Sequence, residues 1–435
     1  MNSSVVMAKP PRETAGKAWS ELLPWLLLPY DSLTWIMGTS VSATSQTLPA
    51  TALYSIIYLV LHRGRLSLGS AGRQVLLVVL AAYFFMIIVT AANIIDEFAR
   101  ANNVLDTYRL ATALRQAISM LMGITTLAMF QSTIRNLGLA RCMRYAALGS
   151  LPTIIAALMQ IGRGEFRVQG LSSEPAQFAD MLVFALIPAV FLGGFSRRLR
   201  VPLLLFGGFL LLLTFSSTGY MKALFAIAAY AVSRGRFVSG LIMAGGIIAI
   251  GGVFLVLNPD NYVVTVLGLL YKGIEDGSYM RIPTFVDRFY GLVGPISLAA
   301  TGHGLFGFGF GGDTVYFPRL FTREIAEIIL SVKADVPALT SMQGKLLMYG
   351  GIFGYSIFLC AWILAFRAAP KGHAARFMMP AIFAGSLFSM GPLFLPHIWL
   401  WLAIASVEAD GRQPLMVRKR PHVPADPAPV PLEAG

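Results

Sequence analysis

Apolar stretches, many of them long enough to cross a membrane, recur along almost the entire chain, and most are separated by short polar connections. An α-helix needs about 20 apolar residues to cross a bilayer, and several of these stretches are shorter. The pattern predicts an all-α integral membrane protein with about 12 transmembrane helices, at residues 20–37, 48–61, 74–92, 108–130, 145–161, 178–195, 201–215, 217–232, 237–257, 343–366, 377–391 and 393–407.

The composition agrees with this pattern. Hydrophobic residues make up 56% of the 435 residues, and charged residues only 13%, about half the share of an ordinary soluble domain. The chain has two cysteines. A soluble enzyme, a nucleic-acid-binding module and a secreted disulfide scaffold are therefore excluded as descriptions of the whole chain.

The positive charge of the chain is distributed unevenly between the two sides of the predicted bundle. The net charge is +13, and most Lys and Arg residues fall in the tails and in alternate connections. The connections on that side, 62–73, 131–144, 196–200, 233–236 and 367–376, contain no Asp or Glu. The positive-inside rule places this side, and both termini, in the cytoplasm. Most of the charge is thus a topology signal and does not indicate a nucleic-acid partner.

This topology divides the chain into five parts. Residues 1–18 form a cytoplasmic tail, 19–257 carry nine helices, and 343–407 carry three more. Residues 408–435 are rich in proline and are expected to be disordered. The remaining part, 258–342, is a long periplasmic segment. Apolar periodicity predicts short amphipathic helices within it, at 261–274, 284–299 and 322–333.

Several basic residues lie on or near the outer side, where membrane insertion disfavours positive charge. Anion binding is one reason to keep them there. The outer segments contain Arg163, Arg167, Arg281 and Arg288. Charges within the spans also indicate function, and those near the outer ends are Arg109, Arg115, Asp180 and Lys222.

A glycine-rich stretch, GHGLFGFGFGGD at 302–313, contains the pattern G-x-G-x-x-G. No strand leads into it, so we do not interpret it as a dinucleotide-binding loop. Glycines also allow a backbone to approach its neighbours closely. The stretch is expected to pack tightly against helices or against a phosphate.

Four stretches resemble motifs of one membrane enzyme superfamily. RVQGLSSEP at 167–175 is similar to an outer loop of bacterial exopolysaccharide polymerases. LTFSSTGY at 213–220 is similar to a serine-rich turn of the O-antigen ligase and polymerase superfamily. FGFG at 306–309 and QGKLLMYGGIFG at 343–354 resemble its later glycine motifs. The chain therefore resembles a Wzy-type O-antigen or exopolysaccharide polymerase over roughly residues 160–366.

Two positions depart from the family pattern. Ser217 stands where the serine-rich turn usually has an arginine, and Lys222 is one turn further along. Thr340 and Ser341 stand where ligases carry a histidine-containing pair. The second departure favours a polymerase over a ligase, and it leaves the general base open.

The resemblance implies a GT-C-like fold and a specific reaction at the periplasmic face of the bacterial inner membrane. A growing glycan on undecaprenyl pyrophosphate is transferred to a hydroxyl of a new lipid-linked repeat unit. Arginines stabilise the leaving pyrophosphate and a base accepts the hydroxyl proton, with no metal, nucleotide or other cofactor. The implied partners are the lipid-linked oligosaccharide, inner-membrane lipid, a chain-length regulator and a flippase.

This reaction assigns roles to the candidate residues. Glu174, His303, Arg281 and Arg288 are the candidate catalytic residues. The candidate pyrophosphate-binding residues are Arg163, Arg167, Lys222, Arg109 and Arg115.

Each assignment has a structural alternative. Glu174 could instead cap the helix that follows it, or pair with Arg167. Arg163 could contact lipid headgroups. His303 could be an ordinary turn residue. In the same way, Arg288 could pair with Asp287 or Glu275, and Arg115 with Asp31 or Asp180.

Two further functions remain open. The first is an O-antigen or protein-glycan ligase of the same superfamily, which differs only in its acceptor. The second is a transporter, such as a flippase for lipid-linked oligosaccharides, which twelve helices with both ends inside would suit. Transporters usually contain two similar halves, and we find no such repeat in this sequence.

Overall fold

The computed structural model describes most of the helical part of the chain. The described residues are 15–30, 50–100, 107–165, 167–172, 174–233, 291–297, 304–313, 339–390 and 393–408, with residues 242, 245, 246, 271, 275 and 288. Most of the predicted helix 237–257, most of the short helix at 261–274, the short helix at 322–333, most of the two tails, Arg281 and His303 lie outside them.

The described part of the chain is helical and contains no β-strand; its one β-bridge joins Ser341 to Met390. The helices are α1 (Ala15–Leu27), α3 (Ala50–Leu61), α4 (Ser70–Arg100), α5 (Thr107–Leu137), α6 (Leu139–Gly149), α7 (Leu151–Gly162), α8 (Pro175–Met181), the π-helix η1 (Leu182–Leu186), α9 (Ile187–Leu192), α10 (Arg197–Leu213), α11 (Ser217–Ser233), α17 (Met342–Ala368), α18 (Ala375–Phe388) and α19 (Pro396–Glu408).

Five helical stretches are long and apolar enough to cross a membrane: 70–100, 109–137, 139–162, 175–192 and 342–368. Shorter apolar helices occupy 50–61, 375–388 and 396–407. The chain is therefore an α-helical membrane protein.

Every predicted helix within the described residues has a counterpart, but several boundaries differ from the prediction. Helix α1 ends at Leu27, well before the predicted residue 37, and α5 continues to Leu137, past the predicted residue 130. Helix α4 continues to Arg100, through residues expected to form an outer loop. Its 31 residues span about 46 Å, which exceeds the hydrocarbon core of about 30 Å, so its charged end extends into the polar zone. The span predicted at 145–161 consists of two helices, α6 and α7, because the chain bends at Ser150, just before Pro152.

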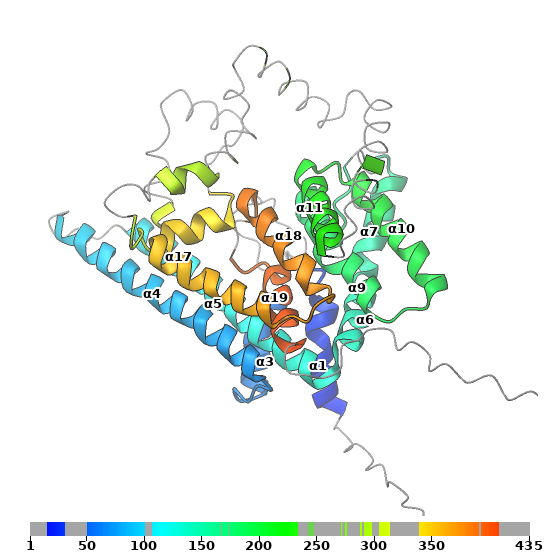
Figure 1. Cartoon of the computed structure of the whole chain (residues 1–435), viewed down its shortest axis with the longest axis horizontal. Coiled ribbons are helices and arrows are strands. Elements are labelled where there is room, and N and C mark those ends of the chain that lie inside the picture. Colours follow the sequence, from blue (N-terminus) through cyan, green and yellow to red (C-terminus); the bar gives the residue numbers. More distant parts are fainter. Residues whose placement is uncertain are drawn as a thin grey trace, which may run out of the picture.

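The other helices pack around the two C-terminal helices, α18 and α19 (Figure 1). Helix α17 lies along α4, α19 packs on α5, and α18 packs on α11. Helices α18 and α19 thus lie between the α4–α5–α17 group and the α8–α11 group. Trp401 of α19 is fully buried and donates to the carbonyl oxygen of Phe184 in η1 at 2.8 Å. This bond satisfies one π-helix carbonyl and fixes α19 against η1.

Candidate functional site

The loop between α7 and α8, residues 163–174, is attached closely to the helices below it. Gln160 of α7 accepts hydrogen bonds from the backbone N–H groups of Gln169 at 3.0 Å and Gly170 at 2.9 Å. Val168 N donates to the carbonyl oxygen of Leu213, at the end of α10. We call the end of the bundle that carries this ordered loop the loop end.

The charged side chains of this loop lie at its surface. Arg163 and Arg167 are exposed, and Glu174 is half-buried. Arg167 is within electrostatic reach of Tyr220 on α11. The backbone is fixed while the guanidinium groups face outward, an arrangement suited to binding an anion at low entropic cost.

Glu174 occupies the N-cap position of α8, but its carboxylate does not form the capping hydrogen bond. Its backbone is extended, with φ −142° and ψ 149°, and its carbonyl oxygen accepts from Gln177 and Phe178. A capping side chain would accept from the second or third backbone N–H of the helix. The capping hydrogen bond that was one alternative to a catalytic role for Glu174 is therefore not made.

The serine-rich turn packs against the helix that follows this loop. Ser216 caps α11 by accepting from the N–H of Gly219 at 3.2 Å. A Cβ on Gly219 would lie 2.4 Å from the Cβ of Ala179 in α8, so only glycine permits this helix crossing. The first two stretches that resemble the superfamily, 167–175 and 213–220, are thus neighbours in space.

A buried ion pair lies beneath that crossing. Lys222 of α11 donates to the carboxylate of Asp180 of α8 at 2.5 Å. The two residues are 1% and 6% exposed. Lys222 and Asp180 were expected near the outer ends of their helices, and the structure brings them together. Lys222 is therefore engaged with a carboxylate and is not displayed at the surface.

His397, in the first turn of α19, lies within electrostatic reach of both members of this pair. It is buried, and its ring is stacked on Phe184 with the ring centroids 5.8 Å apart. Its Nε2 atom is buried and has no hydrogen-bond partner among the described residues. A buried imidazole nitrogen of this kind can accept or donate a proton when a polar group reaches it.

Arg288 also lies near this ion pair. It is half-buried, it is within electrostatic reach of Lys222, and its Nη1 donates to the carbonyl oxygen of Phe388 at 2.9 Å. Phe388 is the last residue of α18, so Arg288 satisfies a carbonyl at a helix C-terminus, where positive charge is favoured.

The two glycine motifs, FGFG at 306–309 and QGKLLMYGGIFG at 343–354, contact each other. Helix α17 is broken at Gly351, which has φ 59° and ψ −163°. The glycine-rich loop enters this break: Phe308 N donates to Met348 O at 2.7 Å, and Ile352 N donates to Gly304 O at 2.9 Å. The loop thus supplies the partners that the interrupted helix would otherwise lack.

Only glycine fits at the alternating positions of this loop. Gly307, Gly309 and Gly311 all have φ between 71° and 83°. A Cβ on Gly307 would lie 2.4 Å from the backbone nitrogen of Gly351, and one on Gly309 would lie 2.4 Å from the Cα of Thr90 in α4. The glycines therefore serve close packing against helices, which resolves the choice between helices and a phosphate in favour of helices.

Arg109 of α5 holds the same loop. Its guanidinium donates to the carbonyl oxygens of Phe308, at 2.9 Å, and Phe310, and its Nε lies 3.5 Å from Glu97 of α4. Its side chain is fully buried. The structure thus places Arg109 in a packing role, while Arg115, two turns further along α5, is exposed.

A second buried polar group lies where the loop meets α17. Asp313 lies within electrostatic reach of Tyr349 and Lys345. Asp313, Lys345 and Tyr349 are all buried. Like the Lys222–Asp180 pair, these three side chains lie at the loop end. They lie among helices α4, α5 and α17, however.

Sequence reasoning missed two residues of these clusters, His397 and Lys345. Both are polar residues in the first turn of an apolar helix. A polar residue inside an apolar span was the available signal.

No family model matches the chain, and no curated protein matches it closely enough to count as a relative. The resemblance described above therefore rests on the four sequence stretches alone.

Proposed function

We propose that the protein is a polysaccharide polymerase with about twelve membrane-spanning helices and a GT-C-like arrangement. In this proposal it resides in the bacterial inner membrane with both termini in the cytoplasm. It transfers a growing glycan from undecaprenyl pyrophosphate to a lipid-linked repeat unit, and the loop end of the bundle faces the periplasm.

The observation that carries the proposal is the described part of the loop between α7 and α8, residues 163–165, 167–172 and 174. Its backbone is bonded to Gln160, Thr153 and Leu213, yet Arg163 and Arg167 face outward. A connecting loop does not need this combination of a fixed backbone and exposed cations. A site for a pyrophosphate does, because the cations must be in position before the charge develops.

The spatial pairing of the four family-like stretches gives further support. The loop 167–175 contacts the serine-rich turn, and the glycine-rich loop enters the break in α17. These pairs come from stretches that are far apart in the sequence. Such contacts give a structural reason why these four patterns should occur together in one protein.

In the proposed reaction, a hydroxyl oxygen of the acceptor attacks the anomeric carbon of the donor glycan. The bond between that carbon and the pyrophosphate oxygen breaks, and undecaprenyl pyrophosphate leaves with the bonding electrons. Arg163 and Arg167 bind the leaving group through paired N–H donors. Because Lys222 is paired with Asp180, it acts in this account by holding α8, and hence Glu174, in place.

Glu174 is the base that the geometry favours for the acceptor proton. It is half-buried beside the arginine-bearing loop, and its carboxylate does not cap α8. His397 is the second candidate, since its Nε2 has no partner among the described residues. It is buried, however, so a substrate would reach it only after the helices around it separate.

One feature of the structure, the broken helix α17, is also found in transporters. Discontinuous helices such as α17 are typical of transporters, whose broken ends hold ions or substrate. Here the glycine-rich loop occupies the break at Gly351 and bonds to both halves of the helix. The break is thus filled by protein, which favours the polymerase over the transporter.

The test is reconstitution of the purified protein into liposomes with undecaprenyl-pyrophosphate-linked repeat units, without nucleotide and with EDTA. We expect a ladder of polymers on a gel. Repeat units that cross the bilayer without being joined would support the transporter. A single transfer to an acceptor other than the lipid-linked repeat unit would support the ligase.

A further inference from the structure

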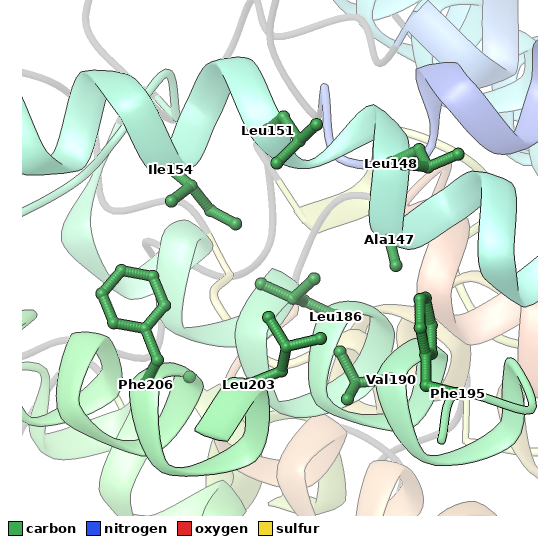
Figure 2. Close-up of a pocket in the computed structure, with 10 residues that line it drawn as sticks. Ala147, Leu148, Leu151, Ile154, Leu186, Val190, Phe195, Leu203 and Phe206 are labelled. Atoms are coloured by element: carbon green, nitrogen blue, oxygen red, sulfur yellow. The ribbon is translucent and has the colours of Figure 1, made fainter. Parts of the chain in front are cut away.

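An apolar groove lies between α6–α7 on one side and η1, α9 and α10 on the other (Figure 2). It has a volume of about 120 Å³ and is partly open to the surface. All of its lining residues are apolar: Ala147, Leu148, Leu151, Ile154, Leu186, Val190, Phe195, Leu203, Phe206 and Gly207. Because a cavity of about 150 Å³ holds benzene, this groove has room for a short stretch of one hydrocarbon chain.

One end of the groove is marked by two arginines. Figure 2 shows Ala147 and Phe195 at one end and Ile154 and Phe206 at the other. Arg144, one turn before Ala147 on α6, donates from Nε to the carbonyl oxygen of Gly193 at 2.9 Å. Arg200 of α10 donates from Nη2 to the carbonyl oxygen of Phe195 at 2.8 Å. Both guanidinium groups are therefore held at the Ala147–Phe195 end.

The charge of these two arginines is not balanced locally. Within the described residues, the hydrogen bonds of both go to backbone carbonyls and neither forms an ion pair. Arg141, Arg197 and Arg198 are exposed on the same two helices, α6 and α10. A cluster of guanidinium groups next to an apolar groove matches a ligand with an anionic head and a hydrocarbon tail.

We propose that this groove binds an anionic phospholipid. One acyl chain lies along Leu151, Leu186 and Leu203, and the phosphate is bound by Arg144 and Arg200. The remainder of the lipid stays in the bilayer. This site is on the opposite end of α7 and α10 from the loop 163–174, so it does not depend on the proposed polymerase activity.

The geometry also predicts selectivity. A zwitterionic phospholipid fits the groove equally well and also carries a phosphate, but the arginines repel its choline cation, so it gains less from them than an anionic phospholipid does. Each basic residue near an anionic membrane surface strengthens lipid binding by about fivefold. We therefore expect the protein to retain phosphatidylglycerol in preference to phosphatidylcholine with the same acyl chains by about tenfold or more.

The experiment is native mass spectrometry of the detergent-purified protein, titrated with each lipid. Arg144→Gln/Arg200→Gln should lose the preference for phosphatidylglycerol, whereas Arg144→Lys should retain most of it. Ala147→Trp should fill the groove and lose the bound lipid although both arginines remain. Arg65→Gln, an exposed arginine in the turn between α3 and α4, is the matched control and should bind as wild type.

Size-exclusion profiles identify any variant that fails to fold. If the double variant fails, Arg144→Lys still tests the role of the charge and Ala147→Trp still tests the role of the groove. Equal retention of the two lipids by wild type would overturn the proposal. So would an equal effect of Arg65→Gln, or unchanged lipid binding by Ala147→Trp. Displacement of phosphatidylglycerol by an equal concentration of a polyprenyl phosphate would also overturn it, because the groove would then belong to the substrate.

Discussion

Lys222 of α11 and Asp180 of α8 form an ion pair of 2.5 Å that is almost entirely removed from solvent. A buried charge that loses its partner is costly, typically about 3–5 kcal/mol, whereas removal of both charges is much less so. The pair therefore fixes the relative position of the two helices that follow the loop 163–174 and the serine-rich turn.

The first prediction concerns this pair. Lys222→Met or Asp180→Leu alone should lower the free energy of unfolding by about 3–5 kcal/mol, while Asp180→Leu/Lys222→Met should recover most of that loss. Thermal unfolding in detergent, followed by tryptophan fluorescence, measures the difference. Single variants as stable as wild type would show that the pair does not hold the helices.

The second prediction concerns the glycine-rich loop. Gly309→Ala should destabilise the protein by about 1–3 kcal/mol, because the position has positive φ and the new Cβ would meet Thr90. Gly208→Ala is the matched control: it lies in α10 with nothing within 4 Å of a new Cβ, so it should be neutral or slightly stabilising. The same unfolding assay compares them, and equal effects would contradict the interlocked loop.

The helices could be predicted from the sequence because hydrophobic runs determine what a bilayer accepts. The apolar run 343–354, however, does not reveal that α17 breaks at Gly351, since the break is stable only when the glycine-rich loop enters it. Likewise Arg109 was expected to bind phosphate, but it donates to two carbonyls of that loop. Contacts of this kind depend on partners between 40 and 201 residues away and leave no local pattern.

The third prediction concerns pH. Burial lowers the pKa of His373, between α17 and α18, to about 4, and its neutral Nδ1 accepts from the N–H of Ala375 at 3.3 Å. In the unfolded chain, His373 binds a proton near pH 6.5. Its contribution to the free energy of unfolding is therefore fully present above that pH. It is lost as the pH falls from about 6.5 toward 4.

The measurement for His373 is the unfolding temperature between pH 7.5 and 4.5. His373→Asn keeps a side-chain acceptor that does not titrate in this range, and it should flatten part of the decline. An unchanged pH profile in this variant would rule out His373 as its source.

The fourth prediction concerns sidedness. In a background with Cys142→Ala and Cys360→Ser, Glu165→Cys should react with an impermeant thiol reagent in intact cells, and Ser233→Cys should not. Both positions are exposed, so access depends only on the side of the membrane. Ser172 and Asp313 are buried and are unsuitable reporters. Labelling of Ser233→Cys alone would reverse the proposed topology.

The fifth prediction concerns the exposed arginines. Arg167→Ala should slow polymer formation about a hundredfold or more if the side chain stabilises the leaving pyrophosphate. Arg167→Lys should recover little, because an ammonium group cannot form paired N–H contacts. Arg65→Ala, at the other end of the bundle, should leave the rate unchanged. Similar rates for all three variants would move the site away from the loop 163–174.

The most direct test of the polymerase account is to count the lipid product. Purified protein in liposomes is given undecaprenyl-pyrophosphate-linked repeat units in EDTA, and both released undecaprenyl pyrophosphate and new glycosidic bonds are quantified. The account predicts one undecaprenyl pyrophosphate for every bond formed, with both rates reduced together by Arg167→Ala. Recovery of every repeat unit still joined to its original lipid would contradict it.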